Sequence, residues 1–249
     1  MFVCIVLGHF FASLFLHSFF LHRYGTHHQF AMTKKWERTF FFLTWLFQGS
    51  SFLNPKSYAR MHLEHHAHSD TPKDPHSPLN FSVSKYGLDF PYAATRMMYM
   101  TKKLFSEIRK ETHEIASLYK NRTFPEWKNF EKFADSKISV ISMGALMVVI
   151  FAVFASGWEW ALLPLVLLNG AIQGAIVNWC GHMWGYRNYI LPDNSKNTWI
   201  LSTLMWGELF QNNHHNDPDN PNFGGPKWYE FDPLYPVILL FKKMNIIQF

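Results

Sequence analysis

The sequence predicts an all-α membrane protein with about three transmembrane helices and a cytosolic helical cap that carries histidine boxes. Two observations predict this class. No Lys or Arg occurs in residues 1–22 or 138–181, and both stretches are apolar and long enough to hold membrane helices. Of the 14 histidines among 249 residues, eight fall in four short clusters beside these stretches. Neutral imidazoles that gather next to a membrane indicate a metal site.

We expect membrane helices at about residues 2–21, 138–158 and 160–179. The first lacks the basic n-region and small-residue cleavage site of a signal peptide, so it is expected to be a retained helix. The other two are joined by a turn at Gly157–Trp160, whose tryptophans suit a membrane interface. Together with regions 22–137 and 182–249, these helices are expected to form one integral-membrane domain over residues 1–249.

The distribution of charge predicts the topology. All 23 Lys and Arg lie in residues 23–137 and 182–249, so the positive-inside rule places both regions in the cytosol. The apolar segment Glu37–Leu53 is ambiguous. If it crossed the bilayer, His62 and His22 would lie on opposite sides and could not share a metal site. We therefore expect this segment to form a helix that lies on the membrane interface or packs under the membrane.

The cytosolic regions are expected to contain further helices at Ala93–Tyr119, at about Thr198–Phe210 and at 234–247. The connector Asp70–Pro78 contains three prolines, which exclude a regular helix.

The overall charge and the cysteines exclude other classes. The formal charge is +5 and the pI about 9.1, but the positive-inside rule accounts for the basic residues, so no nucleic-acid partner is expected. Cys4 and Cys180 lie far apart in apolar segments, which indicates neither a disulfide framework nor a zinc finger.

The four clusters have spacings that suit metal ligation. They are His17/His22, His62/His65/His66, Asn178/His182 and Gln211/His214/His215. The second and fourth are spaced i, i+3, i+4, which puts their side chains on one face of a helix. The third is spaced i, i+4 at the end of a predicted membrane helix. The first is spaced i, i+5, about 140° apart on an ideal helix, so its rings flank a two-metal site or the helix unwinds near His22.

The number of candidate ligands favours two metal ions. Two metals with four or five protein ligands each need about nine groups, whereas one zinc ion needs only three or four. The clusters supply eight histidines together with Asn178 and Gln211. Imidazole without thiolate leaves iron, copper and zinc open.

The remaining histidines are expected to have packing or surface roles. His9 and His113 are isolated, and four others lie near the clusters without partners in phase: His27, His28, His68 and His76.

At these motifs the chain resembles the membrane fatty-acyl desaturases, specifically the delta-9 acyl-CoA desaturase branch. The resemblance covers about residues 10–225 and four motifs in order. These are the H-x4-H box followed by Arg23-Tyr, the H-x2-H-H box followed by Asp74-Pro-His76, Asn178–His182 followed by Met-Trp-Gly-Tyr, and Gly207-Glu-Leu-Phe-Gln-Asn-Asn-His-His215.

The resemblance implies a centre of two iron ions (Fe2+/Fe3+) on the cytosolic side, with Asn178 acting through a water. The implied ligands are His17, His22, His62, His65, His66, His182, His214 and His215. It also implies O2 as co-substrate and removal of hydrogens from adjacent carbons of a fatty-acyl chain, as a CoA thioester, to leave a cis double bond. A buried, kinked tunnel would orient the chain, and a separate ferredoxin, or a small b-type cytochrome with its reductase, would supply two electrons.

Two departures from the family pattern stand out. The family's last box begins with histidine, whereas this chain has Gln211, whose amide is a weaker iron ligand. The family's usual first membrane helix is also not evident, so three crossings replace four. The usage of Asn, Lys and Phe favours a bacterial inner membrane over the endoplasmic reticulum.

Two other functions remain open. A membrane di-iron hydroxylase or ketolase that acts on a lipid or carotenoid would share the histidine chemistry. A non-enzymatic membrane metal-binding protein is the third hypothesis, although a transporter would place polar ligands along a membrane path.

Overall fold

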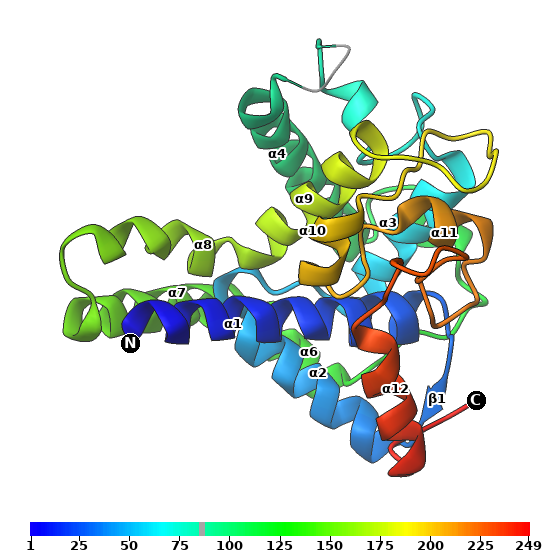
Figure 1. Ribbon diagram of the computed structural model, residues 1–249. Helices are drawn as coiled ribbons and strands as arrows, with labels where there is room; N and C mark the ends of the chain where they lie inside the picture. Colours follow the sequence, from blue (N-terminus) through cyan, green and yellow to red (C-terminus); the bar gives the residue numbers. More distant parts are fainter. Residues whose placement is uncertain (85–87) are drawn as a thin grey trace.

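The computed structural model describes residues 1–84 and 88–249, and these residues are mostly helical (Figure 1). The elements in chain order are α1 Phe2–Leu16, η1 His17–Thr26, β1 Ala31–Met32, α2 Lys34–Gln48, η2 Gly49–Ser51, α3 Pro55–His68, η3 Pro78–Asn80, α4 Phe90–Arg109, α5 Ile115–Leu118, α6 Lys128–Ala134, α7 Lys137–Phe154, η4 Gly157–Leu162, α8 Leu163–Leu167, α9 Asn169–Met183, α10 Trp199–Leu204, α11 Gln211–Asn216, α12 Leu234–Lys243 and β2 Ile247–Gln248.

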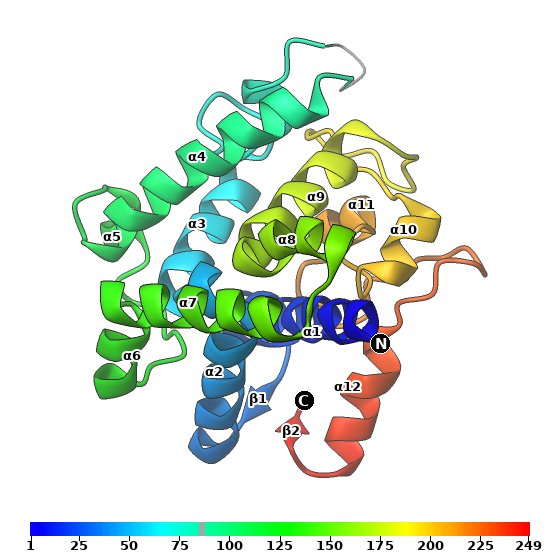
Figure 2. The same cartoon turned by 90° about the vertical axis from the view of Figure 1, so that its left-hand side faces the viewer.

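Two to three segments are long and apolar enough to cross a membrane, in agreement with the prediction of about three. Phe2–Thr26 and Lys137–Phe154 each qualify alone, and Gly157–Leu167 with Asn169–Met183 forms a third candidate. In Figure 1, α1, α7 and α8 project on one side of the molecule, away from α3 and α11. Figure 2 shows α7 converging on the N-terminal end of α1, where the rings of Phe2 and Phe151 lie 4.9 Å apart.

The membrane helix expected at about 160–179 is present as a candidate span, but it is broken. The chain forms the 3-10 helix η4 and the short helix α8, then bends by 75° into α9. Polar groups at the bend find partners from α2 and η2: the Asn169 side-chain amide donates to the Phe47 carbonyl at 2.9 Å, and the backbone N–H of Gly170 donates to the Ser51 hydroxyl at 3.0 Å. Because these groups are satisfied, the bend is stable inside an apolar environment.

The first histidine cluster lies on a π-helix. α1 continues without a break into η1, a π-helix of 10 residues. Hydrogen bonds in a π-helix join residues five apart, so such residues stand one turn above each other. The pair His17 and His22 therefore shares a side of the helix, rather than lying about 140° apart as an ideal α-helix predicts.

Several predicted helices are shorter in the structure. The helix expected over Ala93–Tyr119 is divided into α4 and α5. The helix expected over Thr198–Phe210 ends at Leu204, because Trp206 and Gly207 adopt positive φ angles of 54° and 82°. The C-terminal helix ends at Lys243, and β2 then pairs antiparallel with β1, a two-stranded element that an all-α class does not predict.

α2 occupies the ambiguous segment. It packs along α1, and Thr33 is its N-cap residue, whose hydroxyl accepts a hydrogen bond from Trp36 N. At 15 residues it is shorter than the roughly 20 that a crossing requires, so it is consistent with the expected interfacial helix. The sidedness of the regions between the spans stays a prediction.

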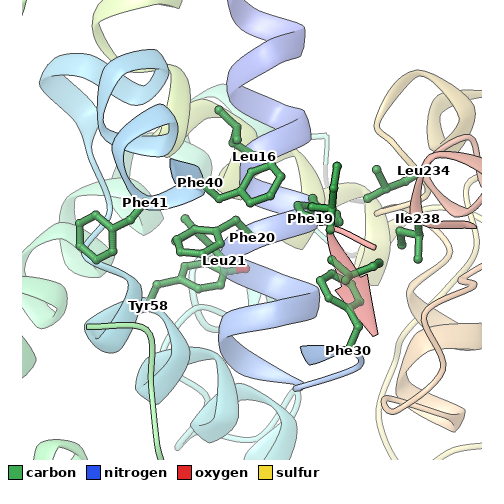
Figure 3. Close-up of a cluster of buried hydrophobic side chains, with 12 residues drawn as sticks. Leu16, Phe19, Phe20, Leu21, Phe30, Phe40, Phe41, Tyr58, Leu234 and Ile238 are labelled. Carbon is green, nitrogen blue, oxygen red and sulfur yellow. The ribbon is translucent and has the colours of Figure 1, made fainter. Parts of the chain in front are cut away.

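A cluster of aromatic side chains holds η1 against its neighbours (Figure 3). Phe19 and Phe20 from η1 are fully buried, and Phe40 and Phe41 from α2 pack beside them. Leu234 and Ile238 bring α12 to the same cluster. This packing fixes the helix that carries the first histidines.

We expect Phe41→Ala to lower the free energy of unfolding by about 3–5 kcal/mol, because it leaves a cavity among the rings of Phe20, Phe52 and Phe130. Its neighbour Phe42 is the matched control, since Phe41 is 0% exposed and Phe42 39%. Denaturation in detergent would measure both variants. Equal stability losses would show that this cluster does not hold α2 in place.

Candidate metal centre

Five histidines from separate parts of the chain converge at one point. His22, His27, His62, His66 and His214 each offer a ring nitrogen, and these nitrogens all lie within 4.8 Å of one another. We call this group the five-histidine cluster. Its Nε2 atoms approach closely: His22 to His214 at 3.1 Å, His66 to His214 at 3.1 Å, and His62 to His66 at 3.0 Å.

A second group lies beside the first. His65, His182 and His215 also offer ring nitrogens within 4.8 Å of one another, and we call them the three-histidine cluster. The Nε2 atoms of all three are buried and have no hydrogen-bond partner among the described residues. The two clusters are adjacent, because the rings of His66 and His215 lie 4.5 Å apart.

Carboxylates stand behind four of these rings. In each case the ring Nδ1 donates a hydrogen bond to a carboxylate oxygen. His22 donates to Glu208 at 2.7 Å. The other three distances are 2.8 Å, for the pairs His65–Asp74, His182–Asp70 and His215–Asp193. A proton held on Nδ1 leaves the Nε2 lone pair free, and this arrangement orients histidines in metal sites. Burial by itself raises the pKa of a carboxyl, but the histidine partners outweigh it and lower the pKa of Asp70 and Glu208 to about 2.

Burial keeps several of the rings neutral. Burial and the neighbouring imidazoles hold the pKa of His62, His66 and His214 well below 6.5. Burial also lowers the pKa of His215 to about 4, although its hydrogen bond to Asp193 opposes this shift. These rings are therefore uncharged at pH 7, the state in which imidazole binds a metal ion.

The geometry fits metal ions. Metal–imidazole bonds are about 2.1 Å long, so two nitrogens at right angles around one ion lie about 3.0 Å apart. The Nε2 distances of 3.0–3.1 Å match this value. The five-histidine cluster can therefore hold a metal ion. The nitrogens of the three-histidine cluster, which lie within 4.8 Å of one another, are also close enough to share one.

Four segments supply the rings. The π-helix carries His22, and its C-cap residue His27 lies one turn further on, with its backbone N–H bonded to the His22 carbonyl. α3 presents three histidines on one face, as their spacing predicts. α3 begins at Asn54, whose side chain accepts from Ser57 N at 3.0 Å, followed by Pro55 at the first helical position. α9 ends at the turn that carries His182.

Asparagines fix the short helix α11, which carries the last two histidines. Asn197 Oδ1 accepts from Asn212 N and Asn213 N, and Asn213 Oδ1 accepts from Asn188 at 2.8 Å. Asn212 Oδ1 in turn accepts from the backbone of residues 188 and 189. A six-residue helix has little stability of its own, so this network explains why amides precede the histidines.

Arg23 ties the C-terminal segment to the clusters. It is fully buried and donates to Glu208 at 2.9 Å and to Asp232 at 2.8 Å. Its guanidinium carbon lies 3.6 Å from the centroid of the Phe223 ring. Glu208 therefore joins Arg23 to His22. Loss of one partner of such a buried pair costs about 3–5 kcal/mol.

The structure brings together seven of the ten predicted ligands and leaves three outside both clusters. His17 is buried, with its ring 4.9 Å from that of Tyr58. Asn178 lies one turn before His182 on α9 and is half-buried. Gln211 is buried, and its amide nitrogen donates to the Glu208 carbonyl at 2.5 Å.

Sequence reasoning missed His27, which was expected to have a packing role. The spacing His22-Arg-Tyr-Gly-Thr-His27 repeats the H-x4-H pattern of His17–His22, so the signal was present in the sequence. Which of the two pairs, His17/His22 or His22/His27, faces the cluster depends on the direction in which the π-helix orients these side chains. His76 also proves to be close: its ring stacks on His65 at 4.6 Å.

Known proteins resemble this chain over nearly its whole length. Residues 1–241 match a family model described as fatty acid desaturase. The sn-1 stearoyl-lipid 9-desaturase of Anabaena variabilis is 26% identical over 230 residues, which cover 90% of this chain and 74% of the relative. The delta-9 desaturase-like 3 protein of Arabidopsis thaliana is 25% identical over 237 residues, 92% of this chain and 70% of the relative. An sn-2 palmitoyl-lipid 9-desaturase of Nostoc sp. (strain 36) is 33% identical over 72 residues, 29% of this chain and 25% of the relative.

We expect His27→Ala to weaken metal binding at least about ten-fold, because it removes a ring from the five-histidine cluster. His17→Ala, on the same π-helix, is the matched control and is expected to change metal affinity by less than about two-fold. Competition with a chelator of known affinity would measure both. The opposite ranking would assign the ligand to His17.

Proposed function

Because this chain belongs to the fatty acid desaturase family, we propose that it is an O2-dependent di-iron desaturase that introduces a cis double bond into a saturated fatty-acyl chain. The observation that carries the proposal is the convergence of eight histidines, six of them buried and two half-buried, in two adjacent clusters. Carboxylates behind four of them support their role as ligands.

The proposed ligands are His22, His27, His62, His66 and His214 at one iron ion and His65, His182 and His215 at the other. Asn178, one turn before His182, is suited to hold a water molecule beside the second ion. Two iron ions would supply the oxidising power: for each double bond, O2 accepts two electrons from a carrier and two from the acyl chain, and leaves as water.

The protein itself orients the histidine rings and the acyl chain and keeps water away from the site. The carboxylates hold four of the eight rings in one orientation and one tautomer, as the chemistry of a ligand requires. The aromatic cluster around Phe19 and Phe20 excludes water from the side of η1. An unactivated methylene reacts only when it is held against the oxidant, so the acyl chain must lie in a fixed position. We expect the kinked path that the family resemblance implies to serve this purpose.

A separate carrier, a ferredoxin or a small b-type cytochrome with its reductase, would deliver the electrons. The active site is proposed to face the cytosol, because Lys and Arg are confined to the regions that carry the clusters. A basic surface there suits an acidic carrier.

A cavity beside α3 favours a substrate with an anionic head group, such as a CoA thioester. It has a volume of about 380 Å³ and is lined by five basic residues and three acids. Arg60, two residues before His62, is 5% exposed, and its Nε is buried without a hydrogen-bond partner among the described residues. A phosphate of the head group would satisfy it and place the thioester near the histidines. Two of the relatives above are instead named for lipid-linked acyl substrates, and the third is named only as a delta-9 desaturase-like protein.

The fatty-acid profile of cells that express the chain with an electron carrier tests the proposed reaction. We expect a new cis-monounsaturated acid, unsaturated at the delta-9 position, that disappears in His62→Ala. His68→Ala is the matched control, because His68 lies on the same helix but outside both clusters. A product heavier by one oxygen would indicate a hydroxylase, and metal binding without any product would leave a metal-binding protein.

A second experiment tests the head group. We expect Arg60→Gln to raise the KM for a saturated acyl-CoA about ten-fold or more with a smaller change in kcat, because the lost charge acts in binding. Lys120→Gln, an exposed lysine away from the cavity, is the control. Product that appears only in intact phospholipid, with no turnover of acyl-CoA, would make the substrate an acyl-lipid.

A further inference from the structure

The two clusters offer unequal numbers of ligands. Five imidazoles meet in one and three in the other. Metal sites with closed protein coordination are structural or inert toward small ligands, whereas sites that keep an open position bind water or substrate. A metal ion in the three-histidine cluster would have open positions, and one in the five-histidine cluster would have few or none.

Gln211 accounts for the difference. It occupies the first position of a spacing, i, i+3, i+4, whose other members are His214 and His215. Its side chain packs against Gly181, the residue before His182: a Cβ added at Gly181 would lie 2.3 Å from Gln211 Cγ. An imidazole at position 211 would therefore stand beside the three-histidine cluster. The amide that is present is held by the Glu208 carbonyl at 2.5 Å.

The three-histidine cluster is nevertheless built as a metal position. All three of its rings donate from Nδ1 to a carboxylate, whereas in the five-histidine cluster His22 alone has such a partner among the described residues. Three carboxylates increase the basicity of the rings and place negative charge around the site, which strengthens the binding of a cation. Their buried Nε2 atoms lack other partners.

We propose that the three-histidine cluster is the coordinatively open metal position, where a small exogenous ligand such as an anion or a diatomic gas binds, because Gln211 withholds a ligand there. The five-histidine cluster binds its metal first and more tightly. This inference rests on the proposed function, since it requires that both clusters hold metal.

Cobalt(II) titration of the chelator-treated full chain in detergent tests the proposal, because the visible spectrum of cobalt reports its coordination. For the wild type we expect two binding steps, the first at least about ten-fold tighter. Azide is the exogenous ligand, and we expect it to change the spectrum only after the second step is filled.

Variants at position 211 separate the possible causes. Gln211→His is expected to tighten the second step and to weaken azide binding, each by about ten-fold or more. Gln211→Glu supplies a carboxylate ligand instead and serves if the histidine variant does not fold. Gln211→Ala is the matched control and should leave both affinities within about two-fold of the wild type.

Three results would overturn the inference. The first is a Gln211→Ala variant that loses the second binding step, because this would make the amide a ligand. The second is a change in the spectrum when azide is added after the first step alone. The third is an azide affinity that Gln211→His leaves unchanged. A folded chain that binds no cobalt at either step would instead remove the metal centre and the proposed function with it.

Discussion

The structure is organised around one constraint: several neutral imidazoles must be held with their Nε2 atoms close together in a dry interior. These atoms lie 3.0–3.1 Å apart in the five-histidine cluster. Groups elsewhere in the fold must therefore fix the orientation of the rings. Carboxylates hold four of them from the Nδ1 side, and aromatic packing holds the π-helix that carries His22 and is followed directly by His27. The loops that carry Asp70, Asp74 and Asp193 have their structural purpose in this support.

Local patterns predicted a large part of this architecture. The apolar stretches without Lys or Arg predicted candidate spans that the structure contains, and the i, i+3, i+4 spacing placed the histidines of α3 on one face. These features depend on neighbours within one or two helical turns, so a single sequence contains them. The three acids behind the three-histidine cluster were not predicted, because they reach their histidines from irregular loops with no periodicity.

Departures from the predicted fold share a physical cause, which is a partner far away in the sequence. α8 and α9 bend because Phe47 and Ser51, more than 100 residues earlier, satisfy the backbone and amide groups at the bend. His27 was assigned a packing role because an ideal α-helix turns it out of phase with His22. The π-helix brings the two together, and nothing in the local propensity of this segment distinguishes a π-helix from an α-helix.

Arg23 gives the chain an order of assembly. It lies at the end of the first span, but its partners Glu208 and Asp232 come late in the sequence. While the chain is being synthesised from its N-terminus, the guanidinium and His22 have no carboxylate to bind until the last two membrane segments have been made. The clusters likewise lack His182, His214 and His215 until then. A metal ion can therefore reach its full set of histidine ligands, with the carboxylates that orient them, only in an almost complete chain.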